Sequence, residues 1–297
     1  MERVKRTFIV ALICIVSLIT TQERAQAQEE SGVKEPASWY ARPEAESTVR
    51  YEFPSSASAI GGRLDITNWE TECSQQIKII GKLPVDLGIE MDYISINNAL
   101  PVKLPSNLVG WSASVGTALP FLNIPDAYIG CEVYPGFYSD GWDFQASAFR
   151  MPQAYFLAYK PDEHWTFAGG VGVAPRYDYN VFPVFSVTYK PNDKITFEVS
   201  SQRPNITYKI SENWSCYIEG RYEENEYLVD RGDDKKVVLL QREILMGGGI
   251  EYKLNKYIRG AISTGGAIDR YFKYRDGNGK VCPDSCLYTE ARVIITI

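Results

Sequence analysis

The sequence predicts an all-β protein, an antiparallel up-and-down transmembrane β-barrel of about 12 strands, with roughly 10 to 14 possible. Three observations lead to this fold. Short segments alternate apolar and polar residues, as strands with one apolar and one wet face do. Tryptophan and tyrosine residues cluster beside tight turns. No apolar run in the body of the chain is long enough to span a membrane as a helix.

The residues from Tyr155 to Tyr222 form the clearest part of this pattern, a ladder of predicted hairpins. Three short turns interrupt the ladder, at Tyr159–Asp162, Tyr189–Asn192 and Lys209–Asn213. Each turn has an aromatic residue close by and joins two alternating segments. The rest of the chain extends the same ladder.

The first residues have the order of a secretory signal peptide, which is a basic start, an apolar run and a small-x-small cleavage site. These three parts are Arg3, Lys5 and Arg6, then Phe8–Ile19, then Ala25–Ala27. We expect residues 1–27 to be cleaved after Sec-type export, residues 28–47 to be a flexible N-terminal segment, and residues 48–297 to form the barrel domain.

The charge of the chain excludes one class of partner. The formal net charge is −6, and it becomes −8 without the signal peptide, which carries four basic and two acidic residues. No basic patch remains that would attract nucleic acid. An exported chain without a second apolar helix is either soluble or crosses a membrane as a closed barrel.

Segments of period two follow one another along the chain. The pattern begins at Leu64–Ile66 and is clear in Val85–Tyr93, where the odd-numbered residues are apolar or aromatic. The further predicted strands are Trp111–Leu119, Ile129–Val133, Trp142–Tyr159 with a bend at Met151–Pro152, Trp165–Val173, Phe185–Lys190, Ile195–Ser200, Ile206–Ile210, the segment around Ile218, Glu243–Lys253 and Ala291–Ile297.

The connections alternate in length. Tight turns follow Tyr159, Tyr189, Ile210 and Lys253, whereas residues 225–236 and 266–285 are expected to be long polar loops. Short turns at one end and long loops at the other are typical of outer-membrane barrels. We expect both chain ends on the periplasmic side, and therefore an even number of strands.

Aromatic positions favour a barrel over a β-sandwich, which would show the same alternation. A sandwich buries its aromatic residues in the middle of its strands, whereas a barrel in lipid places them at the membrane interfaces. Six aromatic residues lie within a few residues of a tight turn and on the apolar face of their strands. They are Tyr159, Trp165, Tyr189, Tyr208, Trp214 and Tyr252.

The opposite face of the predicted strands carries small residues and charges, as the interior of a barrel does. The residues expected to line the lumen are Glu198, Lys209, Glu219, Arg221, Glu243, Glu251 and Arg259. Two arrangements are open for them. They line a cation-preferring pore, or they interlock across the lumen and leave it filled.

Two segments carry a resemblance to a known family. Phe182–Phe197 and Arg203–Trp214 resemble the uncharacterised outer-membrane β-barrel proteins of the DUF6268 family, and the similarity is strongest from about Gly136 to Tyr227. The resemblance implies an outer-membrane barrel but no activity. The chain ends on Ile297, whereas barrels commonly end on phenylalanine.

The sequence holds no constellation that indicates catalysis, a cofactor or a metal. His164 is the single histidine and lies in a predicted turn, so we expect a rim residue and no enzyme. Cys282 and Cys286 are spaced for a small disulfide in the loop before the last strand, in an oxidising compartment.

We expect an outer-membrane protein whose partners are outer-membrane lipid and the barrel-assembly machinery, with the solute unknown. The first hypothesis for its function is a porin-like channel or a structural surface component. The alternatives are a plugged barrel that binds ligands and a soluble periplasmic β-sandwich that acts as a binding module. Extraction behaviour and conductance distinguish these classes.

Overall fold

The structure is a computed structural model, and it describes residues 43–79, 83–142, 144–175, 180–230, 236–277 and 279–296. The predicted signal peptide and residues 28–42 of the predicted N-terminal segment lie outside the described residues. Among the residues that are described, no helix is long and apolar enough to cross a membrane.

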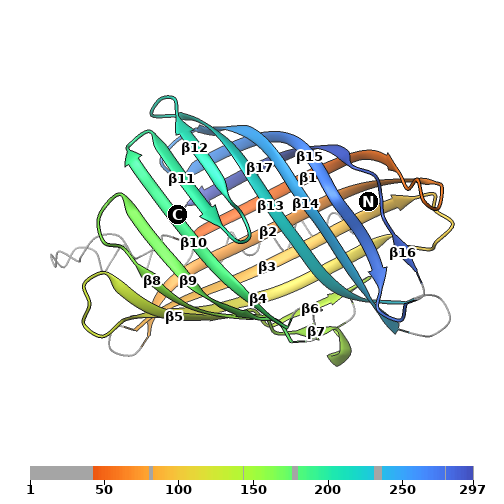
Figure 1. The fold of residues 1–297 in the computed structure, drawn as a ribbon, viewed down its shortest axis with the longest axis horizontal. Helices are drawn as coiled ribbons and strands as arrows, with labels where there is room; N and C mark the ends of the chain where they lie inside the picture. Colours follow the sequence, from red (N-terminus) through yellow and green to blue (C-terminus); the bar gives the residue numbers. More distant parts are fainter. Residues whose placement is uncertain are drawn as a thin grey trace.

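The strands form one antiparallel sheet that closes on itself (Figure 1). The first strand pairs with the second on one edge and with the last on the other, so no edge of the sheet is left open. The elements are β1 (Glu44–Ser56), β2 (Arg63–Ile79), β3 (Leu83–Asn98), β4 (Asn107–Pro120), β5 (Ala127–Val133), β6 (Gly136–Ser139), the short 3-10 helix η2 (Ala146–Ala148), β7 (Phe149–Arg150), β8 (Gln153–Tyr159), β9 (Trp165–Val173), β10 (Val181–Asn192), β11 (Ile195–Ser200), β12 (Asn205–Lys209), β13 (Trp214–Asp230), β14 (Lys236–Lys253), β15 (Ile258–Tyr274), β16 (Lys280–Val281) and β17 (Cys286–Thr296).

The described residues form a ring of 14 strands when β5 with β6, and β7 with β8, are each taken as one interrupted strand and β16 as an addition to β15. The prediction of an all-β up-and-down barrel is confirmed. The count of about 12 is two strands short, because β1 and β15 were not predicted. The sandwich alternative is wrong, since β17 pairs with β1 over Glu44↔Thr296 to Glu52↔Tyr288.

Three predicted boundaries differ from the structure. The sheet begins at Glu44 and not at residue 48, because β1 pairs with both of its neighbours from its first residue. The predicted loops at 225–236 and 266–285 are partly strand, since β13 continues to Asp230 and β15 to Tyr274. The predicted strand at Trp142–Ala148 is wrong, because this segment leaves the ladder and contains η2 before β7 restores the pairing.

Alternation along each strand separates the two faces of the wall. On β13 the side chain of Ile218 is 68% exposed, whereas that of the next residue, Glu219, is 6% exposed. A shift of one residue in register would exchange these faces and move a charge outward. The outer surface is therefore apolar and the inner surface polar over most of the ring.

Aromatic rings cluster at the end of the barrel that carries the tight turns. The rings of Trp165 and Tyr189 stack with their centroids 4.2 Å apart, and those of Trp214 and Tyr252 lie 4.6 Å apart. Each pair joins two neighbouring strands on the outer face. We refer to the end of the barrel with these rings as the short-turn end.

The barrel narrows at the opposite end, which we call the long-loop end. There β13 and β14 extend well past β8–β12 (Figure 1). Leu228 on β13 pairs in parallel with Ser139 on β6, and the amide of Asp140 donates to the carbonyl of Leu228 at 3.2 Å. Because β6 and β13 meet directly, β8–β12 are left out of the wall at this level.

Glycines on the inner wall allow aromatic rings of neighbouring strands to lie against the backbone. A Cβ atom on Gly249 would lie 2.7 Å from the hydroxyl of Tyr217, and one on Gly247 would lie 2.3 Å from the hydroxyl of Tyr288. The Gly247–Gly249 run therefore belongs to a strand that other side chains approach closely.

Two adjacent glycines on β9 provide a test of how closely β8 and β9 pack in the wall of the barrel. A Cβ on Gly170 would lie 1.9 Å from the carbonyl oxygen of Tyr155, whereas a Cβ on Gly169 would meet no atom within 4 Å. We expect Gly170→Ala to destabilise the barrel by about 1–3 kcal/mol or to prevent its folding. Gly169→Ala is the matched control and should leave the stability unchanged.

The measurement is the urea midpoint of the refolded protein together with its heat-modifiable mobility on a denaturing gel. Equal midpoints for the two variants would contradict the strand packing described for β8 and β9.

Candidate functional site

Charged side chains fill the interior near the middle of the barrel, and Arg50 on β1 lies at their centre. Its guanidinium donates to both carboxylate oxygens of Glu223 on β13, at 2.8 Å each, and to Glu243 on β14 at 2.7 Å. Its Nε lies 3.4 Å from Glu52. Because β14, β15 and β17 separate β13 from β1 around the ring, these bonds cross the interior.

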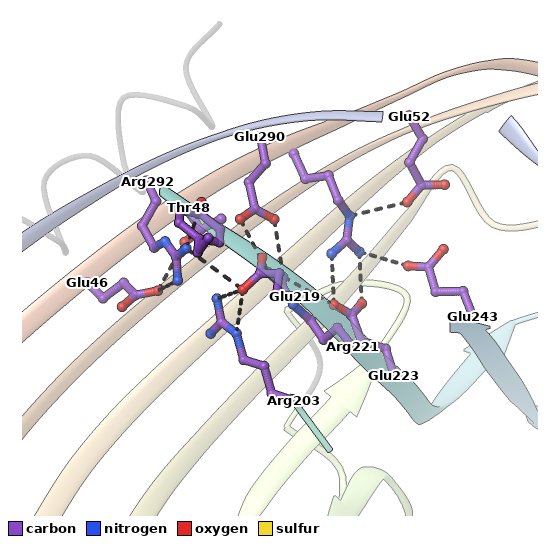
Figure 2. A network of polar contacts seen from close by, with 12 residues as sticks. Glu46, Thr48, Glu52, Arg203, Glu219, Arg221, Glu223, Glu243, Glu290 and Arg292 are labelled. Carbon is purple, nitrogen blue, oxygen red and sulfur yellow. Dashed lines mark hydrogen bonds and ion pairs between the residues drawn. The ribbon is translucent and has the colours of Figure 1, made fainter. Parts of the chain in front are cut away.

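Arg221 on β13 forms a second centre of the same network (Figure 2). It donates to Glu219 at 3.0 Å and to Glu290 on β17 at 3.2 Å. Glu219 also accepts from Arg203 at 3.1 Å, and Arg292 lies 3.9 Å from it. One carboxylate is thus surrounded by three arginines from three parts of the chain.

Arg270 on β15 extends the network toward the long-loop end. It donates to Glu52 at 2.5 Å and to the hydroxyl of Ser55 at 2.9 Å, and it lies 3.8 Å from Glu243. Arg50 and Arg270 are each only 2% exposed. Buried charges of this kind require partners of opposite charge, which explains why acids and arginines alternate through the network.

Apolar side chains close the interior beyond this network, at the long-loop end. They come from the inward faces of five strands, β2, β3, β13, β14 and β15, and from β4, β16 and the adjoining connections. The buried members are Ala57, Leu64, Ile66, Ile94, Ile96, Leu104, Leu108, Tyr227, Val229, Leu239, Phe272, Tyr274 and Val281. We call this set the apolar closure.

Tyr227 connects the apolar closure to the polar part of the interior. Its ring contacts that of Tyr138 on β6, with the centroids 6.0 Å apart, and its hydroxyl donates to Asp92 on β3 at 2.6 Å. The same residue therefore spans from β13 to β3 and β6, across the narrow end of the barrel.

The interior becomes more accessible toward the short-turn end. The side chains of Arg259 and Glu44 are 35% and 37% exposed, although their strands place them on the inward face. The barrel is consequently a vestibule that is accessible at the short-turn end and closed at the long-loop end in this conformation.

Carboxylates that form no ion pair line one wall of the interior in the described part of the chain, on β2 and β3. Glu70 lies opposite Asp92, and Glu72 lies opposite Glu90 in the strand register. Like charges in directly opposed positions are destabilising. Glu90 accepts a hydrogen bond from Ser112, and within the described part of the chain no ion pair joins Glu70, Glu72 or Glu90 to an arginine or lysine. We call these four residues the acidic wall.

The seven residues predicted to line the lumen fall into two groups. Glu219, Arg221 and Glu243 belong to the buried network, where they are paired with other charges. The others lie nearer the short-turn end, where Glu198 accepts from Asn205 at 3.0 Å, Arg259 lies 3.7 Å from Glu251, and Lys209 is exposed.

Several residues of the interior were not predicted. Arg50 and Glu52 lie on β1, a strand that was missed, although Glu44, Glu46, Arg50 and Glu52 share the even positions of one segment. This alternation of charges was the available signal. Arg270 falls in the segment that was predicted to be a loop.

The other predicted features lie outside this interior. His164 is exposed in the turn before β9, and its Nδ1 lies 2.7 Å from the carbonyl oxygen of Lys190. Cys282 and Cys286, for which a disulfide was predicted, are free thiols in this structure. Cys286 is the first residue of β17 and packs against the buried cluster around Leu245, whereas Cys282 is exposed. Among the described residues no acid, histidine or cysteine group has the arrangement of a metal site.

Comparisons with known proteins give one matching family and several similar solved structures. The family described as "Domain of unknown function (DUF6268)" matches residues 85–282. No curated protein matches the chain. Among solved structures, an outer membrane channel of the COG4313 group from Pseudomonas putida F1 has 7% identity and a TM-score of 0.47, covering 89% of this chain and 100% of its own.

Two further solved structures are similar at a lower level. The toluene transporter TodX from Pseudomonas putida has 12% identity and a TM-score of 0.36, with 87% of this chain and 89% of its own covered. The KdgM porin in complex with disordered oligogalacturonate has 8% identity and a TM-score of 0.35, with 85% and 99% covered.

Removal of Arg50 should destabilise the barrel strongly. Arg50→Met leaves Glu223, Glu243 and Glu52 close together without their central cation, and breaking a buried pair typically costs about 3–5 kcal/mol. The matched control is Arg259→Met, whose pair with Glu44 at 3.1 Å is solvent-accessible and contributes about 0–1 kcal/mol.

Urea unfolding followed by tryptophan fluorescence measures both changes. If Arg50→Met lowers the free energy of unfolding no more than Arg259→Met does, the charged network does not stabilise the barrel.

Proposed function

The chain belongs to the DUF6268 family, and from this premise we propose that it is a non-enzymatic outer-membrane β-barrel, a porin-like channel that is closed in the conformation described. The proposal includes insertion into outer-membrane lipid through the barrel-assembly machinery, after export with a cleaved signal peptide. It includes no named solute. Its support comes from the outer surface, the interior and the two ends of the barrel.

The outer surface carries the proposal. Large apolar side chains point outward from neighbouring strands, among them Ile218, Met246 and Ile262, which are 68%, 59% and 66% exposed. Contiguous apolar surface of this kind is rare on proteins in water and is the normal outer face of a barrel in lipid.

The height of this surface fits a bilayer. On β13, Trp214 marks the aromatic cluster at the short-turn end, and Tyr222 lies beside Arg242, whose guanidinium also contacts the ring of Tyr271. The nine residues from Trp214 to Tyr222 make eight steps that span about 27 Å along the strand, or about 20 Å along the axis of a barrel with the usual tilt. An outward apolar band about 25 Å tall is typical of outer-membrane barrels.

The interior supports restricted passage of cations. Glu72 of the acidic wall is exposed and Glu198 accepts from the neutral side chain of Asn205, whereas most of the arginines are paired with carboxylates. A wall with uncompensated negative charge raises the local concentration of cations. Passage to the long-loop end requires movement of the apolar closure, which makes the channel gated.

A second candidate function is a plugged barrel that binds a ligand in its vestibule. The apolar closure favours it, because this cluster of buried aromatic and aliphatic side chains resembles a protein core. In this case the charged network is permanent, and no solute crosses the barrel.

An outward charge tests the membrane position. Ile218 is four residues from both Trp214 and Tyr222, near the middle of the apolar band. We expect Ile218→Arg to cost about 2–4 kcal/mol in a bilayer. On a water-exposed surface the same change would stay within about 0.5 kcal/mol.

Refolding into lipid vesicles at graded urea concentrations gives the measurement, with Lys209→Arg as a control that keeps its charge at the rim. An unchanged free energy of folding for Ile218→Arg, or release of the wild-type protein by osmotic shock without detergent, would rule out the membrane barrel.

Conductance in a planar bilayer distinguishes the channel from the plugged barrel. We expect the wild-type protein to open rarely and the double variant Tyr227→Ala, Phe272→Ala to conduct steadily, because it removes two rings of the apolar closure. Its current should prefer cations, and further replacement of Glu72 and Glu90 by glutamine should reduce this preference about twofold or more.

Phe185→Ala, which removes an outward ring of β10, is the control and should behave as the wild type. If neither the wild type nor the folded double variant conducts, the channel is excluded and the plugged barrel remains.

A further inference from the structure

The inner wall formed by β8, β9 and β10 has an apolar part, in the rows farther from the short-turn end, in contrast to the rest of the interior. Two successive rows of the register carry Ala154, Gly172 and Phe182, and then Phe156, Gly170 and Val184. None of these inward residues is charged or can accept a hydrogen bond through its side chain. The wall is thus unlike that of β13 or β1, where nearly every inward residue is polar.

The two phenylalanine rings lie against the wall and present apolar surface to the vestibule. A Cβ atom on Gly172 would lie 2.4 Å from two ring atoms of Phe182, and one on Gly130 would lie 2.4 Å from Cζ of Phe156. The rings therefore occupy the space above glycines on neighbouring strands. Both rings remain partly exposed.

Negative charge begins next to this apolar wall. Glu132 follows Gly130 on the same face of β5 and lies over Gly116 on β4, with its carboxylate bonded to the hydroxyl of Tyr134. Glu132 also interacts electrostatically with Glu72 of the acidic wall. Glu132 and Phe156 occupy adjacent rows of neighbouring strands, a diagonal separation that aromatic side chains can bridge.

We propose that the vestibule binds amphiphilic organic cations, with the apolar body of the ligand on Phe156 and Phe182 and its ammonium group toward Glu132 and the acidic wall. This inference deepens the proposed function by naming a substrate class for the same interior. Charge complementarity selects the cation, since within the described residues no ion pair joins the acidic wall to an arginine or lysine.

The chemistry of the wall separates this class from others. A sugar requires hydrogen-bonding groups for its hydroxyls, and the two rows around Phe156 and Phe182 have none, whereas the hydroxyls of Thr166, Ser186 and Thr188 lie in the rows nearer the short-turn end. An anion would be repelled by Glu132 and Glu72. A small inorganic cation would gain nothing from the rings. An aromatic ring or alkyl chain with an ammonium group matches both surfaces, through apolar contact and cation–π attraction.

Equilibrium binding to the full-length barrel in phosphatidylcholine nanodiscs tests the proposal, with empty nanodiscs as the blank. The probe is benzyltrimethylammonium, measured by isothermal titration calorimetry. Its matched partners are tetramethylammonium, which lacks the ring, and benzyl alcohol, which lacks the charge. We expect benzyltrimethylammonium to bind about 3- to 10-fold more tightly than either partner.

Variants assign the two halves of the site. Phe156→Ala or Phe182→Ala should weaken binding about 3- to 10-fold and abolish the preference over tetramethylammonium. Glu132→Gln should weaken binding and abolish the preference over benzyl alcohol. Phe185→Ala, an outward phenylalanine on the same strand as Phe182, should bind as the wild type does. Phe156→Leu keeps most of the volume and replaces Phe156→Ala if that variant lacks heat-modifiable mobility.

Each contrary result overturns the inference. Equal affinity for tetramethylammonium would leave only a diffuse acidic surface, and equal affinity for benzyl alcohol would leave only an apolar one. A change caused by Phe185→Ala would place the probe in the lipid boundary. Binding is measured independently of conductance. A barrel that binds the probe but does not conduct would contradict only the channel proposal. A barrel that conducts but does not bind the probe would contradict only the proposed cation site.

Discussion

The hydrogen bonds between β17 and β1 are the constraint on which the rest of the structure depends. They close the sheet, so every strand has two neighbours and no backbone edge is left for lipid or for another chain. Closure also gives the wall an inside and an outside. In the closed barrel, successive residues of a strand point alternately outward and inward. Ile218 is therefore exposed on the outer face, whereas its neighbour Glu219 is buried inside.

The interior is asymmetric both along and across the barrel. Along the axis, accessible charges give way to a compensated network around Arg50 and then to apolar side chains around Tyr227. Across it, the arginines of β1, β13, β15 and β17 are matched by nearby acids, whereas β2 and β3 keep opposed carboxylates. The β8–β10 wall has almost no charge. Three different surfaces therefore face one vestibule, which is the basis for expecting selectivity in it.

Much of the fold could be predicted from the alternation of residues, because one apolar and one polar face leave a signal of period two. The method failed where the outward residues are small. On β15 the outward positions include Gly260, Thr264 and Gly266, which resemble a loop in composition. It also failed on β1, whose first residues, 44–47, were assigned to the flexible N-terminal segment and whose remainder was not recognised as a strand. The ends of β13 and β15 at the long-loop end were predicted as loops because many residues in these segments are polar. Their inward residues Tyr227 and Phe272 are nevertheless buried.

The candidate site was less accessible to prediction than the fold. Alternation identified Glu219, Arg221 and Glu243 as candidates for the inward face, but spacing along one strand does not show which charges meet across a ring. The partner of Glu223 is 173 residues away on β1, and the glycines that accommodate Phe156 and Phe182 belong to other strands. Such contacts depend on curvature and register, which are properties of the closed sheet.

The distances in sequence between these partners have a consequence for the order of folding. Arg50 meets Glu243 over a separation of 193 residues, and Glu44 meets Thr296 over 252. Contacts this remote form late, since the entropy of closing long segments must be overcome first. The hairpins of β8–β12 need no such closure and can assemble early. The arginine network consequently forms only in a barrel whose first and last strands have already joined in the correct register, and it stabilises that state selectively.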